Sequence, residues 1–128
     1  MKVLLDTCTF LWIGIGLPEL SRAAREAFEN VENEVYLSSV SAWEIAIKTA
    51  LGRLRLPEAP QRYVPRLRAQ HGIETLPLAE EAVLHVSRLP DLHRDPFDRM
   101  LVCQAIVHGF VILTPDDAIT QYPAPTLW

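Results

Sequence analysis

The sequence predicts an α/β protein that has a central parallel sheet with helices on both sides. Short apolar runs, typical of strands buried on both faces, recur from Lys2–Leu5 to Val111–Leu113. Between them lie longer segments of helix-forming composition, and this alternation favours parallel strands joined by helices. With 128 residues, of which 49% are hydrophobic and 22% charged, the chain has the size of one domain, residues 1–128, and can bury a core.

For the first half of the chain we expect two strands and three helices. The strands are residues 2–5 (KVLL) and 35–37, and the helices are residues 9–15, 21–30 and 41–54. Ser21 is a natural N-cap for the second helix. In the third helix the apolar side chains recur with a helical period, and the face that they predict consists of Trp43, Ile47, Ala50, Leu51 and Leu54.

For the second half we expect a helix over residues 62–70, a strand over 73–76 and a helix over 79–88. Pro65 must lie in the first turn of its helix or kink it. The next helix begins at Asp95-Pro96, because proline favours the first helical position, and ends at His108 before Gly109. A buried strand at Val111–Leu113 and a short helix after Asp116 complete the series.

Composition excludes several classes of protein. Two cysteines, Cys8 and Cys103, provide no disulfide framework and no paired metal-ligand spacing, so both are expected to be core residues in a reducing, cytoplasmic compartment. No apolar run reaches the roughly 20 residues that span a bilayer, and Asp6 interrupts any signal-like segment. The GxxxxGK[ST], GxGxxG and GxSxG motifs are absent, and a phosphatase of the dehalogenase type would need an acid where Cys8 stands.

The net charge of −4 argues against binding to nucleic acid, but the arginines are unevenly distributed. The chain has ten Arg and two Lys, and five of the Arg lie within sixteen residues: Arg53, Arg55, Arg62, Arg66 and Arg68. Such a stretch is either a local surface for phosphates or an ordinary solvated helix face.

Four acidic residues are expected to meet at one edge of the sheet. Asp6 directly follows the first strand, and Asp116 follows the last buried strand. Glu44 lies near the start of the helix after the second strand, and Asp98 lies in the first turn of the helix before the last strand. In open α/β sheets the active crevice lies at the carboxyl ends of the strands, so these four side chains converge there.

Most of these acids also have an explanation in helix capping. Asp6 suits the N-cap of the helix that follows it, and Asp116 or Asp117 suits the N-cap of the last helix. Asp95 and Asp98 are spaced so that the second acid falls at the third helical position, where the helix dipole favours it.

Glu44 has a capping explanation of its own. Ser41-x-x-Glu44 fits a capping box, and Lys48 lies one turn further on as an ion-pair partner. A separate local role accounts for each acid on its own, but these roles do not explain why all four acids lie at one edge of the sheet. Clustered carboxylates repel each other unless a cation lies among them, and oxygen ligands suit Mg²⁺ or Mn²⁺. The joint pattern favours a metal site.

Four segments occur in order between residues 4 and 117: LLDTCTFLW, SSVSAWEIAIKTALGRL, DPFDRMLVCQAIVHG and FVILTPDD. In this order they resemble the PIN-domain family and more narrowly the VapC-type toxins of bacterial toxin–antitoxin pairs, and the resemblance extends over nearly the whole chain. The resemblance implies a three-layer α/β/α fold around a central parallel sheet. It also implies an Mg²⁺- or Mn²⁺-dependent ribonuclease that hydrolyses phosphodiester bonds of RNA, forms a homodimer and is inhibited by a cognate antitoxin.

The resemblance further implies which acids form the site. Asp6 of LLDT, Glu44 of WEIAIK and Asp98 of DPFDR match the family's core triad, and Asp116 matches the acid of its T-x-D element beside Thr114. These carboxylates would hold one or two metal ions for hydrolysis. Two neighbours, Asp95 and Asp117, remain alternatives to Asp98 and Asp116.

Several other residues lie close to these acids in the sequence. Lys48, Arg94 and Arg99 are expected either to contact phosphates or to pair with the acids themselves, and His93 either supports the site or is a surface residue beside a cap. Two other functions also remain: a PIN-type nuclease of RNA processing outside toxin–antitoxin systems, and a non-catalytic RNA-binding module. The full set of acids argues against the last, because an RNA-binding surface would lose negative charge there.

Overall fold

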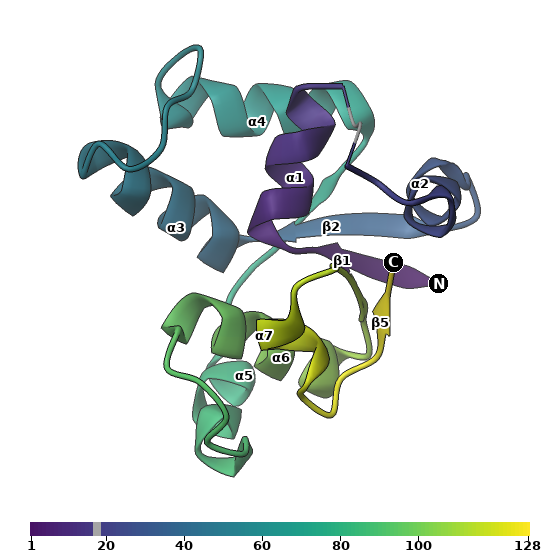
Figure 1. The fold of residues 1–128 in the computed structure, drawn as a ribbon, viewed down its shortest axis with the longest axis vertical. Helices are drawn as coiled ribbons and strands as arrows, with labels where there is room; N and C mark the ends of the chain where they lie inside the picture. The colour runs from purple at the N-terminus through teal and green to yellow at the C-terminus, as the bar shows by residue number, and fades with distance from the viewer. Residues whose placement is uncertain (17–18) are drawn as a thin grey trace.

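The protein is described by a computed structural model that covers residues 1–16 and 19–128. Its centre is a five-stranded sheet of order β3-β2-β1-β4-β5, and every neighbouring pair is parallel (Figure 1). The strands are β1 (Lys2–Leu5), β2 (Glu34–Ser38), β3 (Glu74–Leu76), β4 (Val111–Leu113) and β5 (Thr126–Leu127).

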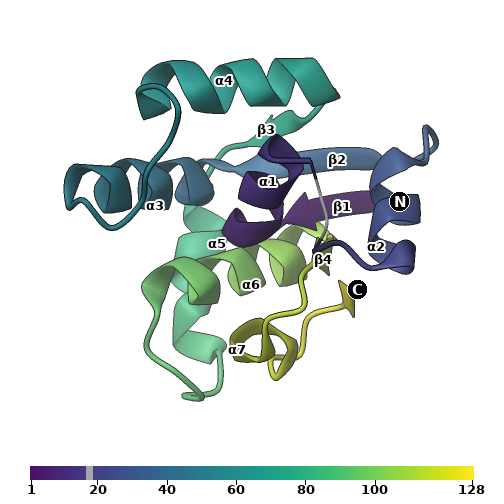
Figure 2. The ribbon, with the colours of Figure 1, turned by 45° about the horizontal axis from the view of Figure 1, so that its top comes forward.

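The helices that connect these strands lie on both sides of the sheet (Figure 2). They are α1 (Thr7–Gly14), α2 (Arg22–Glu29), α3 (Ser39–Ala50), α4 (Pro60–His71), α5 (Glu80–His85), α6 (Pro96–His108) and α7 (Asp117–Thr120), with a 3₁₀ turn η1 (Val86–Arg88) after α5. The expected three-layer α/β/α architecture is therefore confirmed. No helix in the described ranges is long and apolar enough to cross a membrane.

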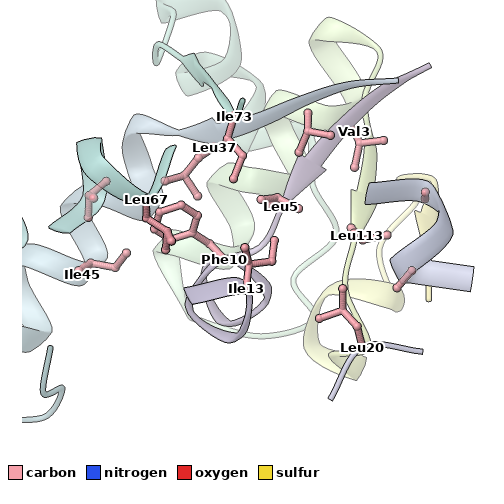
Figure 3. Close-up of a cluster of buried hydrophobic side chains, with 14 of the residues drawn as sticks. Val3, Leu5, Phe10, Ile13, Leu20, Leu37, Ile45, Leu67, Ile73 and Leu113 are labelled. Atoms are coloured by element: carbon pink, nitrogen blue, oxygen red, sulfur yellow. The ribbon is translucent and has the colours of Figure 1, made fainter. Parts of the chain in front are cut away.

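β1 is the central strand, and its side chains alternate between two hydrophobic cores. Val3 and Leu5 pack into a cluster with Phe10 of α1 and Leu67 of α4 (Figure 3). Leu4 points to the other side and belongs to the cluster built on α5 and α6. All three β1 residues are fully buried, which is why the strand is an uninterrupted apolar run in the sequence.

The strand order reverses beside β1. From β1 the chain adds β2 and β3 on one side, and it then returns through α5 and α6 to add β4 on the other side of β1. The carboxyl ends of β1 and β4 thus meet where consecutive connections diverge, which is the usual position of a binding crevice in parallel sheets.

Three parts of the fold differ from expectation: the edge of the sheet, the start of α4 and the helix expected over residues 79–88. The sequence did not predict β5, a two-residue strand in which Thr126 pairs with Ile112 and Leu127 with Leu113. Helix α4 begins at Pro60 rather than at residue 62, and it continues through Pro65. The helix expected over residues 79–88 is divided into α5 and η1.

Helix α3 ends earlier than expected and buries a different face. It stops at Ala50, and the chain then turns through Gly52, which adopts a φ of +72°. The predicted apolar face is wrong, because Trp43 and Leu51 are 56% and 61% exposed. The side chains that α3 buries are Val40, Ser41, Glu44 and Ile45. Polar residues on the buried face mask its helical period in the sequence.

Candidate functional site

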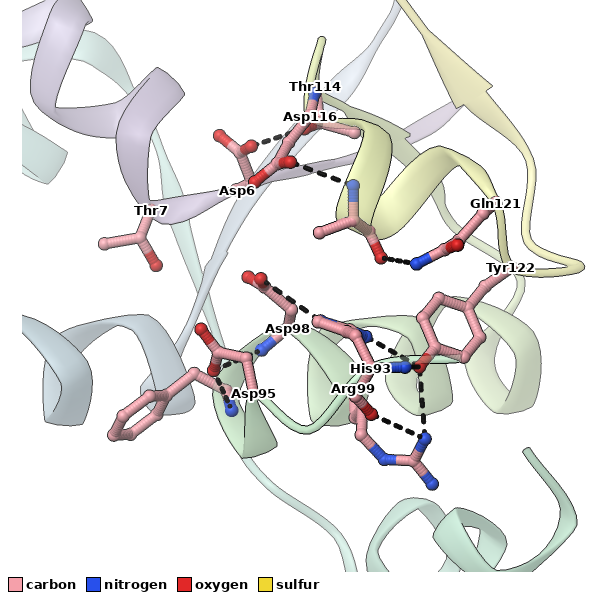
Figure 4. A network of polar contacts seen from close by, with 12 residues as sticks. Asp6, Thr7, His93, Asp95, Asp98, Arg99, Thr114, Asp116, Gln121 and Tyr122 are labelled. Atoms are coloured by element: carbon pink, nitrogen blue, oxygen red, sulfur yellow. Dashed lines mark hydrogen bonds and ion pairs between the residues drawn. The ribbon is translucent and has the colours of Figure 1, made fainter. Parts of the chain in front are cut away.

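Asp6 links the ends of the two central strands. It follows β1 and caps α1, where its Oδ1 accepts a hydrogen bond from the Thr9 backbone N–H at 2.7 Å. Its Oδ2 accepts a hydrogen bond from the hydroxyl of Thr114, which follows β4 (Figure 4). Only 4% of Asp6 is exposed, and burial raises the pKa of its carboxyl although both threonines act in the opposite direction.

Glu44 reaches the same region from the second turn of α3. Its Oε1 accepts a hydrogen bond from the Thr7 hydroxyl at 2.7 Å, and Lys48 forms an ion pair with its Oε2. The predicted capping box is wrong, because Ser38 caps α3 by accepting the Val40 N–H at 3.0 Å. Glu44 is therefore buried for a reason other than capping. The pairing with Lys48 is confirmed, and the hydrogen bond to Glu44 raises the pKa of Lys48.

The two acids of the DPFDR segment have different surroundings. Asp95 is the N-cap of α6, and its Oδ1 accepts the Phe97 N–H at 2.9 Å. Asp98 lies in the first turn, and its Oδ2 is 3.5 Å from Nε2 of His93. Burial raises the pKa of Asp98 to about 7, and the nearby charges of Asp95 and Glu44 act in the same direction.

Asp116 faces the group from the end of β4. It caps α7 by accepting the Ala118 N–H at 2.9 Å, and its own N–H donates to the Thr114 hydroxyl at 3.1 Å. Asp117 is the first residue of α7 and is exposed. Asp116 is therefore the acid that the structure brings to the site.

All four predicted acids line one cavity of about 100 Å³. The full lining consists of Asp6, Thr7, Cys8, Glu44, Lys48, Asp95, Asp98 and Asp116. Asp95, left open by the sequence, belongs to this lining, whereas Asp117 does not. Figure 4 shows Asp6 and Asp116 on one side, facing Asp95 and Asp98 on the other.

Two residues of the lining were missed or misplaced by the sequence reasoning. Thr7 and Cys8 line the acid cavity because they directly follow Asp6 in the first turn of α1. The expectation that Cys8 is a core residue is wrong, because its side chain is exposed, whereas Cys103 is buried as expected. Partial burial together with the charges of Asp6 and Glu44 raises the pKa of Cys8 to about 11, so the thiol stays protonated near neutral pH.

Apart from Lys48, which pairs with Glu44, the arginines described here have other partners or lie outside the acid cavity. The Arg99 guanidinium donates to the Pro90 carbonyl and to the Tyr122 hydroxyl, each at 3.1 Å. Arg66 pairs with Glu58 at 2.5 Å, and the five arginines of the Arg-rich stretch are not among the residues lining the acid cavity. The role of the Arg-rich stretch in binding a polyanion stays a prediction.

The acid cavity has the donor chemistry of a site for a hard divalent cation. Five carboxylates line it, and the raised pKa values of Asp6 and Asp98 show that negative charge is unfavourable there. A cation relieves this repulsion. In the described parts of the chain, however, no three His, Cys, Asp or Glu side chains are already placed to hold one metal ion. The donors fit by type, and binding requires them to turn toward a common point.

Comparison with known families shows which family the chain belongs to. The family model described as PIN domain matches residues 3–125, which is nearly the whole chain. The chain belongs to the PIN-domain family. The resemblance that the sequence motifs carry is thereby confirmed, and the four acid-bearing segments all lie within the matched range of this PIN domain.

Two relatives agree with this assignment. The PIN domain is 32% identical to ribonuclease VapC22 of Mycobacterium tuberculosis, over 98% of both chains. It is also 32% identical to ribonuclease VapC16 of the same organism, in a match that spans only 62% of each chain.

The fold is similar to those of two solved complexes. One is VapBC2 from Rickettsia felis bound to a promoter DNA fragment, with a TM-score of 0.71, 14% identity, and coverage of 99% of this chain and 98% of that chain. The other is DNA-bound VapBC from Salmonella typhimurium, with a TM-score of 0.69, 22% identity, and coverage of 100% and 97%.

Proposed function

We propose that this PIN domain is a metal-dependent ribonuclease that hydrolyses phosphodiester bonds of RNA and is the toxin of a VapBC-type toxin–antitoxin pair. One observation carries the proposal: Asp6, Glu44, Asp98 and Asp116, from four separate segments, line one cavity at the point where the strand order reverses. The relatives named ribonuclease VapC22 and VapC16 support the RNA substrate, and the similarity to VapBC complexes supports an antitoxin partner.

In this proposal Asp6, Glu44, Asp98 and Asp116 hold Mg²⁺ or Mn²⁺. Held by these four carboxylates, a divalent ion would supply activation of water for hydrolysis and would offset charge on the scissile phosphate. The protein's own groups keep the carboxylates in place. Thr9 and Thr114 hold Asp6, and Thr7 and Lys48 hold Glu44. Asp95 fixes the start of α6 and thus the position of Asp98.

Two features favour this function over the alternatives. A non-catalytic RNA-binding module gains nothing from five carboxylates around one cavity, because they repel phosphates. A nuclease of RNA processing has the same chemistry, but the relatives support the toxin. An RNA substrate also agrees with a cytoplasmic location. The exposed Trp43 and Leu51 give α3 an apolar surface that suits the expected homodimer.

The test is cleavage of RNA by the purified protein with and without Mg²⁺, mapped at nucleotide resolution. Asp6→Asn keeps the volume and the capping oxygen of the side chain but removes its charge, so we expect a folded protein that no longer cleaves. Asp117→Asn is the matched control, because Asp117 lies next to Asp116 but does not line the cavity. Cleavage without metal, or wild-type cleavage by Asp6→Asn, would contradict the proposal.

Co-purification tests the partner. When the protein is expressed together with a small protein encoded beside its gene, we expect the two to form a stable complex and RNA cleavage to stop. An active protein that no neighbouring gene product inhibits would instead support the nuclease of RNA processing.

A further inference from the structure

The loop before α6 places an imidazole between Asp98 and a buried tyrosine (Figure 4). Nε2 of His93 lies 3.5 Å from Oδ2 of Asp98, and Nδ1 lies 2.7 Å from the hydroxyl of Tyr122. Tyr122 is 3% exposed, and the side chains of His93 and Asp98 are 19% and 18% exposed. The three groups form a chain that leads from the core to the acid cavity.

Counting donors and acceptors at Tyr122 assigns the proton on His93. The phenolic oxygen accepts hydrogen bonds from Arg99 at 3.1 Å and from the His93 backbone N–H at 3.2 Å. A hydroxyl oxygen accepts two hydrogen bonds and donates one. Its own proton is therefore donated to Nδ1 of His93. In the neutral ring the remaining proton is on Nε2, the atom that faces Asp98.

The ring of His93 is held in this orientation from several directions. Arg99 donates to the carbonyl oxygens of Pro90 at 3.1 Å and of His93 at 3.4 Å, so it fixes the backbone of the loop. Tyr122 is part of the hydrophobic core under α6. Nε2 is buried and forms no hydrogen bond within the described part of the chain. The Asp98 carboxylate lies 3.5 Å from it, at the limit of hydrogen-bond distance, so a small turn of the carboxylate would bring the two groups into a hydrogen bond.

The Asp98 carboxylate has fewer partners than the carboxylates of Asp6 and Glu44. Asp6 is held by Thr9 and Thr114, and Glu44 is held by Thr7 and Lys48. The cap of α6 is made by Asp95, so the Asp98 carboxylate does not take part in it. For Asp98 the structure shows one side-chain partner in the described residues, and that partner is His93.

We propose that His93 is a positioning residue, whose Nε2–H, fixed by Tyr122 and Arg99, holds the Asp98 carboxylate turned toward the acid cavity. The inference rests on the proposed function, in which Asp98 holds the metal. A group that donates a hydrogen bond to a metal-binding carboxylate sets its orientation, and loss of such a group typically weakens metal binding by about 10- to 100-fold.

The first test measures Mn²⁺ binding to the whole chain by calorimetry, with activity as a second readout. We expect His93→Ala to bind Mn²⁺ about 10- to 100-fold more weakly and to need correspondingly more metal for cleavage. His93→Gln should recover most of the affinity, because the amide nitrogen of glutamine replaces the Nε2–H donor. His85→Ala is the matched control, since it removes an imidazole in α5, outside the acid cavity, and we expect wild-type affinity.

The second test needs neither metal nor RNA. The ¹⁵N chemical shifts of the imidazole in the metal-free protein distinguish the two neutral tautomers, and we expect the Nε2-protonated form for His93. We expect Tyr122→Phe, which removes the hydroxyl that orients Nδ1, to lower Mn²⁺ affinity without removing any group that lines the cavity. This variant and His93→Gln keep the test decisive if His93→Ala does not fold.

The outcomes separate this inference from the proposed function. Wild-type protein that binds Mn²⁺ and cleaves RNA, together with unchanged Mn²⁺ affinity in His93→Ala or Tyr122→Phe, overturns the inference alone. The Nδ1-protonated tautomer also overturns it. Wild-type protein that neither binds Mn²⁺ nor cleaves RNA refutes the proposed function, and the positioning role with it.

Discussion

Asp98 should make the metal-free protein less stable as the pH rises. Its carboxyl has a pKa of about 7 in the folded chain, in place of 3.8, because burial and the neighbouring acids disfavour the ionised form. Between these values the folded chain keeps a proton that the unfolded chain has released, so the free energy of unfolding falls as the pH increases. A difference of about three pH units, at 1.36 kcal/mol for each unit, corresponds to about 4 kcal/mol over the whole interval, of which about 3 kcal/mol falls above pH 5.

The assay is urea unfolding in EDTA from about pH 5 to about pH 8, with wild type and Asp98→Asn side by side. Asparagine has no proton to lose, so Asp98→Asn should be more stable than wild type near pH 8. The difference in the free energy of unfolding between the two proteins should shrink toward pH 5. Asp6 also has a raised pKa, and its contribution is common to both proteins. The exposed Asp91 provides the control variant Asp91→Asn, which should follow wild type.

Divalent metal should counteract the loss of stability that the metal-free protein shows as the pH rises. Mg²⁺ binds the folded chain and offsets the charge of the acids, so it should stabilise wild type at the upper end of the pH range and Asp98→Asn much less. The reasoning would be refuted by a free energy of unfolding in EDTA that stays level or rises with pH. It would equally be refuted by an Asp98→Asn variant that is less stable than wild type near pH 8.

Three further predictions concern other parts of the molecule. Glu44→Gln keeps the acceptor for Thr7 but removes the charge that would hold the metal, so cleavage should be lost; the free energy of unfolding should change by about 1 kcal/mol only, because Lys48 is 43% exposed and stays hydrated without its partner, and full activity would contradict the site. Gly14→Ala should cost about 1–3 kcal/mol by thermal unfolding, because the added methyl group would overlap the buried Tyr63 hydroxyl; an unchanged Tm would contradict the packing of α1 on α4. Replacing Arg62, Arg66 and Arg68 together by Gln should lower the affinity for RNA and make that affinity depend less on salt concentration. An unchanged dependence of affinity on salt would mean that the Arg-rich stretch is an ordinary solvated surface.

The strands that carry the site could be predicted because burial on both faces leaves a simple pattern. Val3, Leu4 and Leu5 are consecutive apolar residues followed by Asp6, and the strand at Val111–Leu113 repeats this arrangement before Thr114. Parallel strands end at one edge, so the convergence of the acids follows from the order of the elements. β5 left no comparable signal, because two residues are too few for a periodicity.

Helix α3 shows why the rest could not be predicted. Its buried face includes Glu44, which lines the cavity, and Ser41, which accepts a hydrogen bond from Thr7, so the apolar period favoured the opposite face, where Trp43 is exposed. Sites commonly break the local pattern in this way. The contact of His93 with Tyr122 had no signal either, because 29 residues separate them and only the packing of α7 against α6 brings them together.

The hydrogen bond from Thr114 to Asp6 joins residues 108 positions apart, and this affects how a newly made chain becomes active. Synthesis proceeds from the N-terminus, so β1 and Asp6 leave the ribosome long before β4, the neighbour that completes the centre of the sheet. Until Thr114 and Asp116 have emerged, one wall of the cavity does not exist. On the proposed function, a nascent chain that has not yet exposed Thr114 and Asp116 is unable to cut the RNA around it, and activity begins only after β4 has paired with β1.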